Sequence, residues 1–397
     1  MKILRIAYDW PPPWDGLAPA PYEMTAAQED LGHEITVFCG RWPRSGSLEN
    51  PGEVNIKTFL REPIPGTLNL LISPALFLYY LFWRKRNPVD VIHSHGHFGI
   101  WIYWWRTFLK RRFPKAKELQ TPLVVHFHNT VKGRAENLKE MRKSVNPVSK
   151  SLSWPLAEKS DRWAVESAEA LIFVSEDTRK EAIKFYNADP EKCYLVESGV
   201  NTRLFSRVGQ EEKNKTRGDL ELVENDIVVL NHGAIVERKN IHLLVEAMKF
   251  LPIRYKLLLA GPPSDEDYEA KISEIINVNH LGDRIVRVGY TPYPQVPIAF
   301  QAADIFVLPS SWEGFPKVVV QSLACGVPVL ASGFKASEDI KGLFYLENTE
   351  SENIAREIER IISESPRVDT EFIREHYSWT VMARKVQAIY DKLVRSQ

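Results

Sequence analysis

The clearest chemical pattern lies in residues 304–332, DIFVLPSSWEGFPKVVVQSLACGVPVLAS. An apolar strand is expected to end at Leu308. A short loop then carries Glu313 before a helix that begins near Pro316, because proline suits a first helical position. The Glu313 carboxylate could accept hydrogen bonds from sugar hydroxyls, and the N–H groups at the helix start attract an anion. The alternative is that Glu313 only caps the helix.

A second candidate lies in residues 231–248, NHGAIVERKNIHLLVEAM. Lys239 is expected between a strand and a helix, with Arg238 beside it. A fixed cation there could offset the negative charge of a departing diphosphate, since hydrogen bonds to charged groups are worth about 1.5–3 kcal/mol each. The alternative is that Lys239 is a solvated lysine at the start of a helix.

The elements that must position these residues follow from the hydrophobic pattern, which alternates strands and helices in two runs. The first run predicts a helix near 22–31 and strands at 2–8, 34–39, 90–95, 122–128, 170–175 and 192–198. The second run predicts strands at 226–233, 255–261, 284–289, 304–310 and 327–332, and helices at 240–250, 266–278, 293–302 and 317–325. Residues 207–222 are charged and nearly free of bulky apolar side chains, so we predict a linker there.

This alternation predicts an α/β fold with two Rossmann-like, doubly wound parallel sheets, each covered by helices on both faces. The predicted domains are residues 1–206 and 223–376, joined by the linker 207–222. Two lobes on one linker predict a cleft between them. Ligands of such sheets bind beyond the carboxyl ends of the strands.

Composition excludes several other classes of protein. The 397 residues are 44% hydrophobic and 26% charged, which excludes a disordered or fibrous chain. Lys plus Arg and Asp plus Glu both number 51, so no global charge favours nucleic acid. The opening MKILRIAYDW lacks the apolar stretch of a secretory signal and predicts a strand. The chain has no CxxC pair, which excludes a disulfide framework or a zinc ribbon and fits a reducing compartment; its isolated cysteines are Cys39, Cys193 and Cys325.

Basic and aromatic residues gather in residues 51–150, which hold 17 Lys and Arg against 6 Asp and Glu. The segment 68–86 is almost long enough to span a bilayer, but Pro74 interrupts it, so we predict a buried or interfacial helix. In 98–117, aromatic side chains can share one helical face. Both segments suit an anionic membrane surface, and the alternative is ordinary helices with a solvated basic rim. The basic residues predicted on a second face of 98–117 are Arg106, Lys110 and Lys117.

The string PSSWEGFPKVVVQSLACGVPVLAS resembles the signature of the retaining glycosyltransferases of family 4, which have the GT-B fold. In that family a Glu, seven residues and a second Glu bind the donor: the first contacts the sugar hydroxyls and the second the nucleotide ribose. Glu313 matches the first, and Gln321 stands at the second. An amide can still bond ribose hydroxyls, but it lacks the charged acceptor of a carboxylate.

Two further segments carry the resemblance. Residues 231–248 are similar to a family segment whose Arg and Lys bind the donor diphosphate. Lys239 stands at the Lys position, Ala234 replaces the Arg, and Arg238 is a candidate to compensate. In the N-terminal loop, Gly16 keeps the second Gly of a turn that approaches the diphosphate, while Asp15 replaces the first.

Histidines of the first half also match the family. His128 ends PLVVHFH at the position of a family histidine that contacts the donor sugar near the reacting carbon, whereas His126 is expected to be packed. HSHGH (93–97) looks like a metal site, but DVIHSH matches a family strand that is not one. Residues 377–397 resemble the closing helix of the family, which packs back on the first domain.

The resemblance implies a hexosyltransferase that moves a sugar, with retention, from a UDP- or GDP-sugar to a glycan or lipid-linked acceptor. Such enzymes serve cell-surface polysaccharide or glycolipid synthesis. No metal or other cofactor and no nucleic acid partner is implied, and a cytoplasmic chain, peripheral at the inner membrane face, is expected. Glu313, His128 and Lys239 are the implied catalytic residues. The implied donor-binding residues are Gly16, Arg238, Gly314, Phe315, Pro316, Lys317, Val318 and Gln321.

Two alternatives remain. A nucleotide-sugar epimerase is also two-lobed, but it would need acidic and basic groups around the sugar in place of the EGFP string. A catalytically weak or partner-dependent homologue that binds nucleotide sugar is suggested by the substitutions at Asp15, Ala234 and Gln321 taken together.

Overall fold

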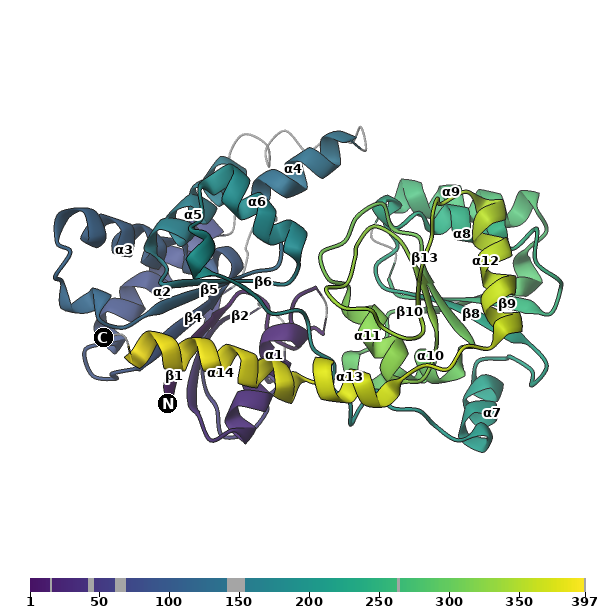
Figure 1. Cartoon of the computed structure of the whole chain (residues 1–397), viewed down its shortest axis with the longest axis horizontal. Helices are drawn as coiled ribbons and strands as arrows, with labels where there is room; N and C mark the ends of the chain where they lie inside the picture. The colour runs from purple at the N-terminus through teal and green to yellow at the C-terminus, as the bar shows by residue number, and fades with distance from the viewer. Residues whose placement is uncertain (15, 42–45, 61–68, 141–153, 263–264, 396–397) are drawn as a thin grey trace. The chain divides into compact units, whose positions relative to one another are not determined.

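The computed structural model describes residues 1–14, 16–41, 46–60, 69–140, 154–262 and 265–395. The chain divides into two compact units, one made of Met1–Ser198 with Trp379–Gln397 and the other of Gly199–Ser378. Each unit contains one parallel sheet with helices packed against it (Figure 1). The predicted α/β fold with two Rossmann-like sheets is therefore confirmed.

The sheet of the first unit has the strand order β3-β2-β1-β4-β5-β6-β7, and every pair is parallel. Its strands are β1 (Lys2–Ala7), β2 (Glu34–Arg41), β3 (Asn55–Leu60), β4 (Val91–His95), β5 (Leu123–Phe127), β6 (Ala170–Phe173) and β7 (Cys193–Leu195). Its helices are α1 (Pro19–Asp30), α2 (Asn69–Trp83), α3 (Ile100–Arg112), α4 (Val131–Glu140), α5 (Trp154–Ser167), α6 (Glu176–Tyr186) and α14 (Trp379–Arg395).

Side chains alternate between the two faces of this sheet, as the period of a strand requires. In β1, Leu4 and Ile6 join a buried apolar cluster with residues of α2, α3 and α5. The residue between them, Arg5, points to the opposite face, where it contacts the side chain of Gln28 in α1. Helix α14 packs beside α1, although the two are far apart in sequence (Figure 1).

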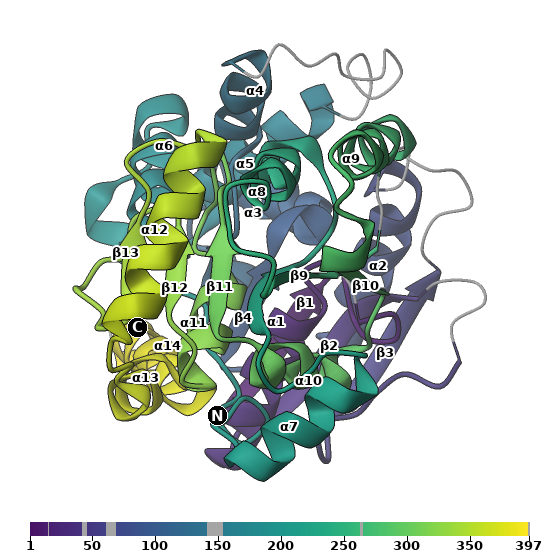
Figure 2. The ribbon, with the colours of Figure 1, turned by 90° about the vertical axis from the view of Figure 1, so that its right-hand side faces the viewer.

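The sheet of the second unit has the order β10-β9-β8-β11-β12-β13 and is also parallel (Figure 2). Its strands are β8 (Ile227–His232), β9 (Tyr255–Ala260), β10 (Ile285–Gly289), β11 (Ile305–Leu308), β12 (Val329–Ala331) and β13 (Leu343–Tyr345). Its helices are α7 (Gln210–Asp219), α8 (Ile241–Ala247), α9 (Glu266–Val278), α10 (Pro297–Ala302), α11 (Lys317–Ala324), α12 (Ser351–Glu364) and α13 (Thr370–Tyr377). Helices α8, α9 and α12 share one apolar core with the sheet.

The predicted strands all form, within a few residues of their expected ends, but several local predictions are wrong. Strands β3 and β13 were not predicted. Helix α1 begins at Pro19 and not near residue 22, because prolines in a first turn remove N–H groups that would have no helical partner.

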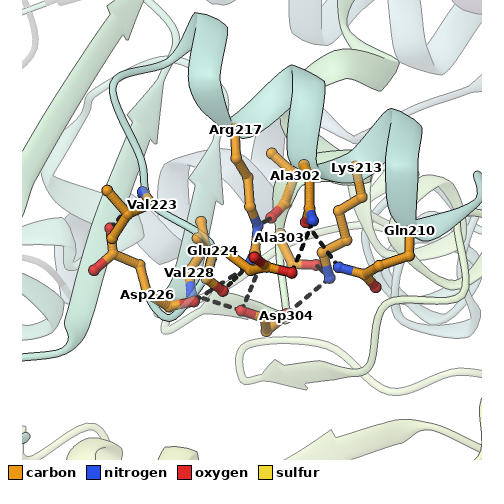
Figure 3. Close-up of polar contacts among 11 residues, drawn as sticks. Gln210, Lys213, Arg217, Val223, Glu224, Asp226, Val228, Ala302, Ala303 and Asp304 are labelled. Atoms are coloured by element: carbon orange, nitrogen blue, oxygen red, sulfur yellow. Dashed lines mark hydrogen bonds and ion pairs between the residues drawn. The ribbon is translucent and has the colours of Figure 1, made fainter.

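The third error is the predicted linker 207–222, which contains helix α7. Arg217 is 3% exposed, and its guanidinium bonds the Ala302 carbonyl at 2.9 Å and the Asp304 carboxylate at 2.6 Å (Figure 3). Lys213 Nζ lies 2.8 Å from the other oxygen of Asp304. Ion pairs to Asp304 and the hydrogen bond to the Ala302 carbonyl of α10, and not apolar side chains, attach this helix to the rest of the second unit. A hydrophobic pattern does not detect such contacts.

The predicted basic face of 98–117 is also wrong at Arg106. This side chain is 1% exposed and its guanidinium lies 2.8 Å from the Glu169 carboxylate, which also binds Lys110 Nζ at 2.7 Å. The acidic partner comes from a distant part of the sequence, so helical periodicity alone could not assign Arg106 to the interior. Lys117 is exposed. Among the described residues, no helix combines the length and the apolar character needed to cross a membrane.

Candidate active site

The loop that carries Glu313 connects a buried strand to a buried helix. Strand β11 is apolar throughout and ends at Leu308, and Pro316 follows the loop in an extended conformation (φ −74°, ψ 114°). Helix α11 begins at Lys317, so the proline caps the helix and is not its first residue. The loop therefore lies at the carboxyl edge of the parallel sheet, where ligands of this fold class bind.

Two donors hold the Glu313 carboxylate in place. Arg238 Nη1 lies 2.6 Å from Glu313 Oε1, and the hydroxyl of Ser310 donates to the same oxygen at 3.0 Å. The Arg238 guanidinium also donates to the Trp312 carbonyl at 3.1 Å and lies 5.2 Å from the centre of the Trp312 ring. Charge-assisted bonds of this kind fix the direction of a carboxylate.

The close approach behind this loop requires glycine. The Glu313 N–H donates to the carbonyl of Gly333 at 2.7 Å. Gly333 has φ +81°, and a Cβ at that position would lie 2.5 Å from the Ser310 carbonyl oxygen. Only glycine accepts both the positive φ and the contact.

The loop with Arg238 and Lys239 follows β8, the neighbour of β11 in the sheet. It forms a short 3₁₀ turn over Glu237–Lys239. The Ser311 N–H donates to the Arg238 carbonyl at 2.8 Å, and the Asn240 amide donates to the Pro309 carbonyl at 3.0 Å. These bonds join two loops that are about seventy residues apart in the sequence.

Lys239 is a buried cation at the end of β8. Lys239 is 8% exposed. A Cβ atom at Gly233 would overlap the Lys239 Nζ atom. Burial lowers the pKa of Lys239, while the nearby Glu313 carboxylate raises it. Burial and the Lys239 charge together lower the pKa of His232 to about 3, so that imidazole stays neutral at physiological pH.

Two cations and one carboxylate therefore meet at this edge of the second unit. One positive charge remains in excess, and the first turn of α11 adds N–H groups that favour an anion. The cluster is suited to a ligand with a phosphate next to a hydroxyl-bearing group.

The other donor-binding residues predicted in the second unit differ in their burial and in their position relative to α11. Phe315 is buried, and its ring lies 5.7 Å from that of Tyr377 at 7° between planes, so only its backbone could face a ligand. Gln321 is 6% exposed and lies about one turn into α11. The remaining predicted residues are in the loop or the first turn of α11: Gly314, Pro316, Lys317 and Val318.

In the first unit, Gly16 has φ +55° and lies in the loop before α1, where the Leu17 N–H donates to Asp9 Oδ2 at 3.4 Å. Asp15 lies outside the described residues. A cavity of about 130 Å³ opens at the carboxyl edge of this sheet. Its lining includes Tyr8, Asp9, His95, His97, His128 and Asn129.

His128 follows β5 and is one of four histidines with nearly parallel rings. The register pairs His95 with His126 across β4 and β5, and His95 Nδ1 lies 3.3 Å from His128 Nε2. Burial lowers the pKa values of His93, His95 and His126 well below 6.5, so these three rings are neutral. His126 is 4% exposed, as expected for a packed histidine.

Ring nitrogens of His93, His95 and His126 lie within 4.8 Å of one another, the spacing of a metal site. The Arg5 guanidinium, however, donates to His95 Nε2 at 2.8 Å and lies 3.5 Å from His93 Nδ1. The Tyr390 hydroxyl lies 2.5 Å from the same His93 nitrogen. A metal ion would have to displace a fixed positive charge, so this donor set fits a hydrogen-bonded network better than a metal ligand set.

Sequence reasoning missed Ser310, Trp312 and His232 in the second unit and Arg5 in the first. Ser310 and Trp312 lie within the segment that resembles the family signature. Only the fold shows that Ser310 bonds Glu313 and that Trp312 contacts Arg238. Arg5 had a signal, because a charged residue in the apolar strand KILRIA is unusual unless it has a partner in the interior.

Comparisons with known proteins cover both units. Residues 14–204 match the family model described as Glycosyltransferase Family 4, and residues 212–379 match the model described as Glycosyl transferases group 1. An uncharacterized glycosyltransferase of Methanocaldococcus jannaschii is 24% identical over 98% of this chain and 98% of its own length.

One further relative and one solved structure have more informative names. A UDP-Gal:alpha-D-GlcNAc-diphosphoundecaprenol alpha-1,3-galactosyltransferase of Escherichia coli is 25% identical over 77% of this chain and 72% of its own. The structure of HepE from Anabaena in complex with UDP-glucose has a TM-score of 0.74 at 17% identity, covering 99% of this chain and 100% of that one. At this identity, the similarity to the Anabaena structure shows a shared fold only.

Proposed function

The chain belongs to the family 4 glycosyltransferases of GT-B fold, and from this premise we propose that it transfers a hexose-type sugar from a nucleotide-sugar donor, with retention, to a glycan or lipid-linked acceptor. The observation that supports this most directly is the cluster of Glu313, Arg238 and Lys239 at the carboxyl edge of the second sheet. The name of the Anabaena structure, which holds UDP-glucose, supports a UDP-sugar donor.

In the proposed reaction, the bond between the anomeric carbon and the diphosphate oxygen breaks, and the acceptor hydroxyl oxygen bonds to the same face of that carbon. The hydroxyl proton passes to the departing diphosphate. Negative charge grows on the departing diphosphate, and Lys239 with the first turn of α11 stabilises it. The Lys239 cation is already desolvated in the folded chain, so it need not reorganise when the charge develops. We propose that these groups suffice without a metal ion.

Glu313 and His128 orient the donor sugar in this proposal. Arg238 and Ser310 donate to the Glu313 carboxylate and hold it in position to accept hydrogen bonds from sugar hydroxyls. The Gln321 amide binds the nucleotide ribose as both donor and acceptor. Among the two cations, Arg238 is already paired with Glu313, which leaves the phosphate role mainly to Lys239.

The test is donor hydrolysis without acceptor, measured for the full chain over a panel of UDP- and GDP-sugars. We expect Lys239→Met and Glu313→Gln each to lower kcat by about 10²–10³-fold, the usual loss for one preorganised charge-stabilising group. Lys249→Met is the matched control, because Lys249 is exposed and lies just after α8. Equal losses in all three variants would contradict the assigned roles.

The same panel distinguishes the partner-dependent alternative. Nucleoside diphosphate binding in calorimetry, without hydrolysis of any donor or transfer to any acceptor, would overturn the proposed enzyme and leave a nucleotide-sugar-binding homologue. Binding that survives Lys239→Met unchanged would remove the phosphate role of this residue even if transfer occurs.

An anionic lipid surface is the proposed setting of the acceptor, at the inner face of the membrane. Helices α2 and α3 are adjacent, with the Phe77 and Trp105 rings 6.5 Å apart. Large apolar side chains on both helices face solvent, with Phe82 71% and Phe108 41% exposed. The E. coli relative named above uses a diphosphoundecaprenol acceptor by its name, which supports a lipid-linked substrate. Exposed basic residues in and after these helices are Lys85, Arg86, Arg111, Arg112, Lys115 and Lys117, of which Arg111 is paired with Glu166.

A further inference from the structure

Arg5 is a charged residue in the centre of a buried sheet. It is fully buried, and the register of β1 and β4 pairs it with His93 and pairs Ala7 with His95. Because Leu4 and Ile6 face the apolar core on the other side, Arg5 faces the histidines. Burying a guanidinium is costly unless it makes hydrogen bonds, so its contacts at this position have to be strong.

The contacts of Arg5 reach His128 through one intermediate ring. Arg5 Nη1 donates to His95 Nε2 at 2.8 Å, and His95 Nδ1 lies 3.3 Å from His128 Nε2. The planes of the His95 and His128 rings are 21° from parallel. Gln28 Oε1 accepts from the other terminal nitrogen of Arg5 and fixes the guanidinium.

The direction of both bonds follows from one chemical fact, because a guanidinium donates hydrogen bonds and cannot accept them. His95 Nε2 must therefore be the acceptor. Burial lowers the pKa of His95 well below 6.5, so its neutral ring carries its single hydrogen on Nδ1. That hydrogen is donated to His128 Nε2, and a neutral His128 must then carry its own hydrogen on Nδ1.

We propose that Arg5, acting through His95, is a positioning residue that fixes His128 as the Nδ1–H tautomer, so that His128 serves the donor sugar as a hydrogen-bond donor and not as a base. The catalytic part of this inference rests on the proposed function, whereas the tautomer does not. With Nε2 occupied by His95 and Nδ1 protonated, the neutral ring has no nitrogen left to take a proton. A retaining transfer is compatible with this, because it does not require His128 to act as a base.

The tautomer can be measured directly on the full chain labelled with ¹⁵N-histidine, without any substrate. Long-range ¹H–¹⁵N correlations at pH 7.5 report which ring nitrogen carries hydrogen, and loss of one signal set in His128→Gln assigns that residue. We expect Nδ1–H for both His95 and His128. Nε2–H at either residue, or an averaged mixture at His128, would overturn the proposal.

Variants distinguish this relay, the hydrogen bonds from Arg5 through His95 to His128, from simple packing. His95→Asn keeps an N–H donor at the position of Nδ1. His95→Leu removes that donor, and Arg5→Met removes the donor that fixes the tautomer of His95. We expect His128 to remain Nδ1–H in His95→Asn and to become a tautomer mixture in the other two. His126→Phe is the matched control, because this ring is stacked 4.9 Å from His128 but its nitrogens bond none of the described residues. A mixture in His126→Phe alone, with Arg5→Met unchanged, would contradict the relay.

Kinetics then test the catalytic part. In donor hydrolysis we expect His95→Leu to lower kcat about tenfold with little change in KM, and His95→Asn to recover most of that loss. If the tautomers are as expected but His128→Gln hydrolyses donor as fast as the original chain, the role assigned to His128 is wrong while the relay stands. If no variant and no original chain hydrolyses any donor, the proposed function fails and the tautomer measurement still judges the relay.

Discussion

At the scale of single residues, the structure assigns different tasks to the two neighbouring cations. Arg238 is paired with Glu313 at 2.6 Å and covers the Trp312 ring, so its charge mainly orients the carboxylate. Lys239 is buried beside Gly233 and has no comparably short ion pair among the described residues. The substitution at Ala234 therefore leaves Lys239 as the main candidate for the donor diphosphate.

The buried histidines make stability depend on pH, and His126 is the simplest case. Burial holds its pKa well below 6.5 in the folded chain, whereas the unfolded chain takes up a proton below pH 6.5. The unfolded state then binds more protons, so the free energy of unfolding falls as pH falls below 6.5. At pH 5.5 the expected loss is on the order of 1 kcal/mol for this one residue.

The measurement is urea unfolding at pH 7.5 and pH 5.5. We expect His126→Phe to show a smaller drop between the two pH values than the original chain. His280→Asn serves as control because His280 is exposed. An identical drop in the original chain and in His126→Phe would show that this histidine does not carry the effect.

At the scale of elements, the position of Glu313 depends on how strand ends meet. The loops after β8 and β11 bond each other through Ser311 and Asn240, and the loop after β12 supports Glu313 through Gly333. Neighbouring parallel strands end at the same edge, so three loops from separate parts of the sequence form one surface.

Gly333→Ala should disturb this surface. Its Cβ would lie 2.5 Å from the Ser310 carbonyl at a positive φ, so the loop must shift and move Ser310 away from Glu313. We expect a destabilisation of at least about 1 kcal/mol and a clear rise in the Kd for nucleotide sugar. In Gly282→Ala, the control, the new Cβ meets no atom within 4 Å, and neither quantity should change much. Unchanged donor affinity in Gly333→Ala would show that the loop does not need this support.

At the scale of the whole molecule, a neutral total charge hides a concentration of basic residues in the first unit. Residues 51–150 carry 17 basic and 6 acidic side chains. Part of this charge is neutralised internally, since Arg106 and Lys110 share Glu169 and Arg111 binds Glu166. The exposed remainder lies close to exposed aromatic side chains, the combination expected for contact with anionic lipid.

We therefore expect the full chain to co-sediment with vesicles that contain anionic lipid at low salt and to be released at high salt. Replacing Lys115 and Lys117 with Glu should weaken binding, because each exposed cation contributes about 1 kcal/mol near such a surface. Replacing Lys249 and Lys271 with Glu, two exposed lysines of the second unit, makes the same change in net charge. Equal loss in both double variants, or no binding at low salt, would contradict a specific lipid surface.

The sequence by itself determined the succession of strands and helices, because continuous apolar strands and amphipathic helices are local patterns. It also pointed to Glu313, Lys239 and His128 through motifs that lie within short segments. It could not place Arg106 or Arg217 inside the protein, because their acidic partners, Glu169 and Asp304, are 63 and 87 residues away.

Only the tertiary structure decided which polar groups meet. Strand register brings Arg5 next to the histidines of β4, and the shared edge of β8 and β11 brings Arg238 to Glu313. Hydrogen bonds and ion pairs depend on distance and direction in space, and residues far apart in sequence acquire both only when the sheet forms.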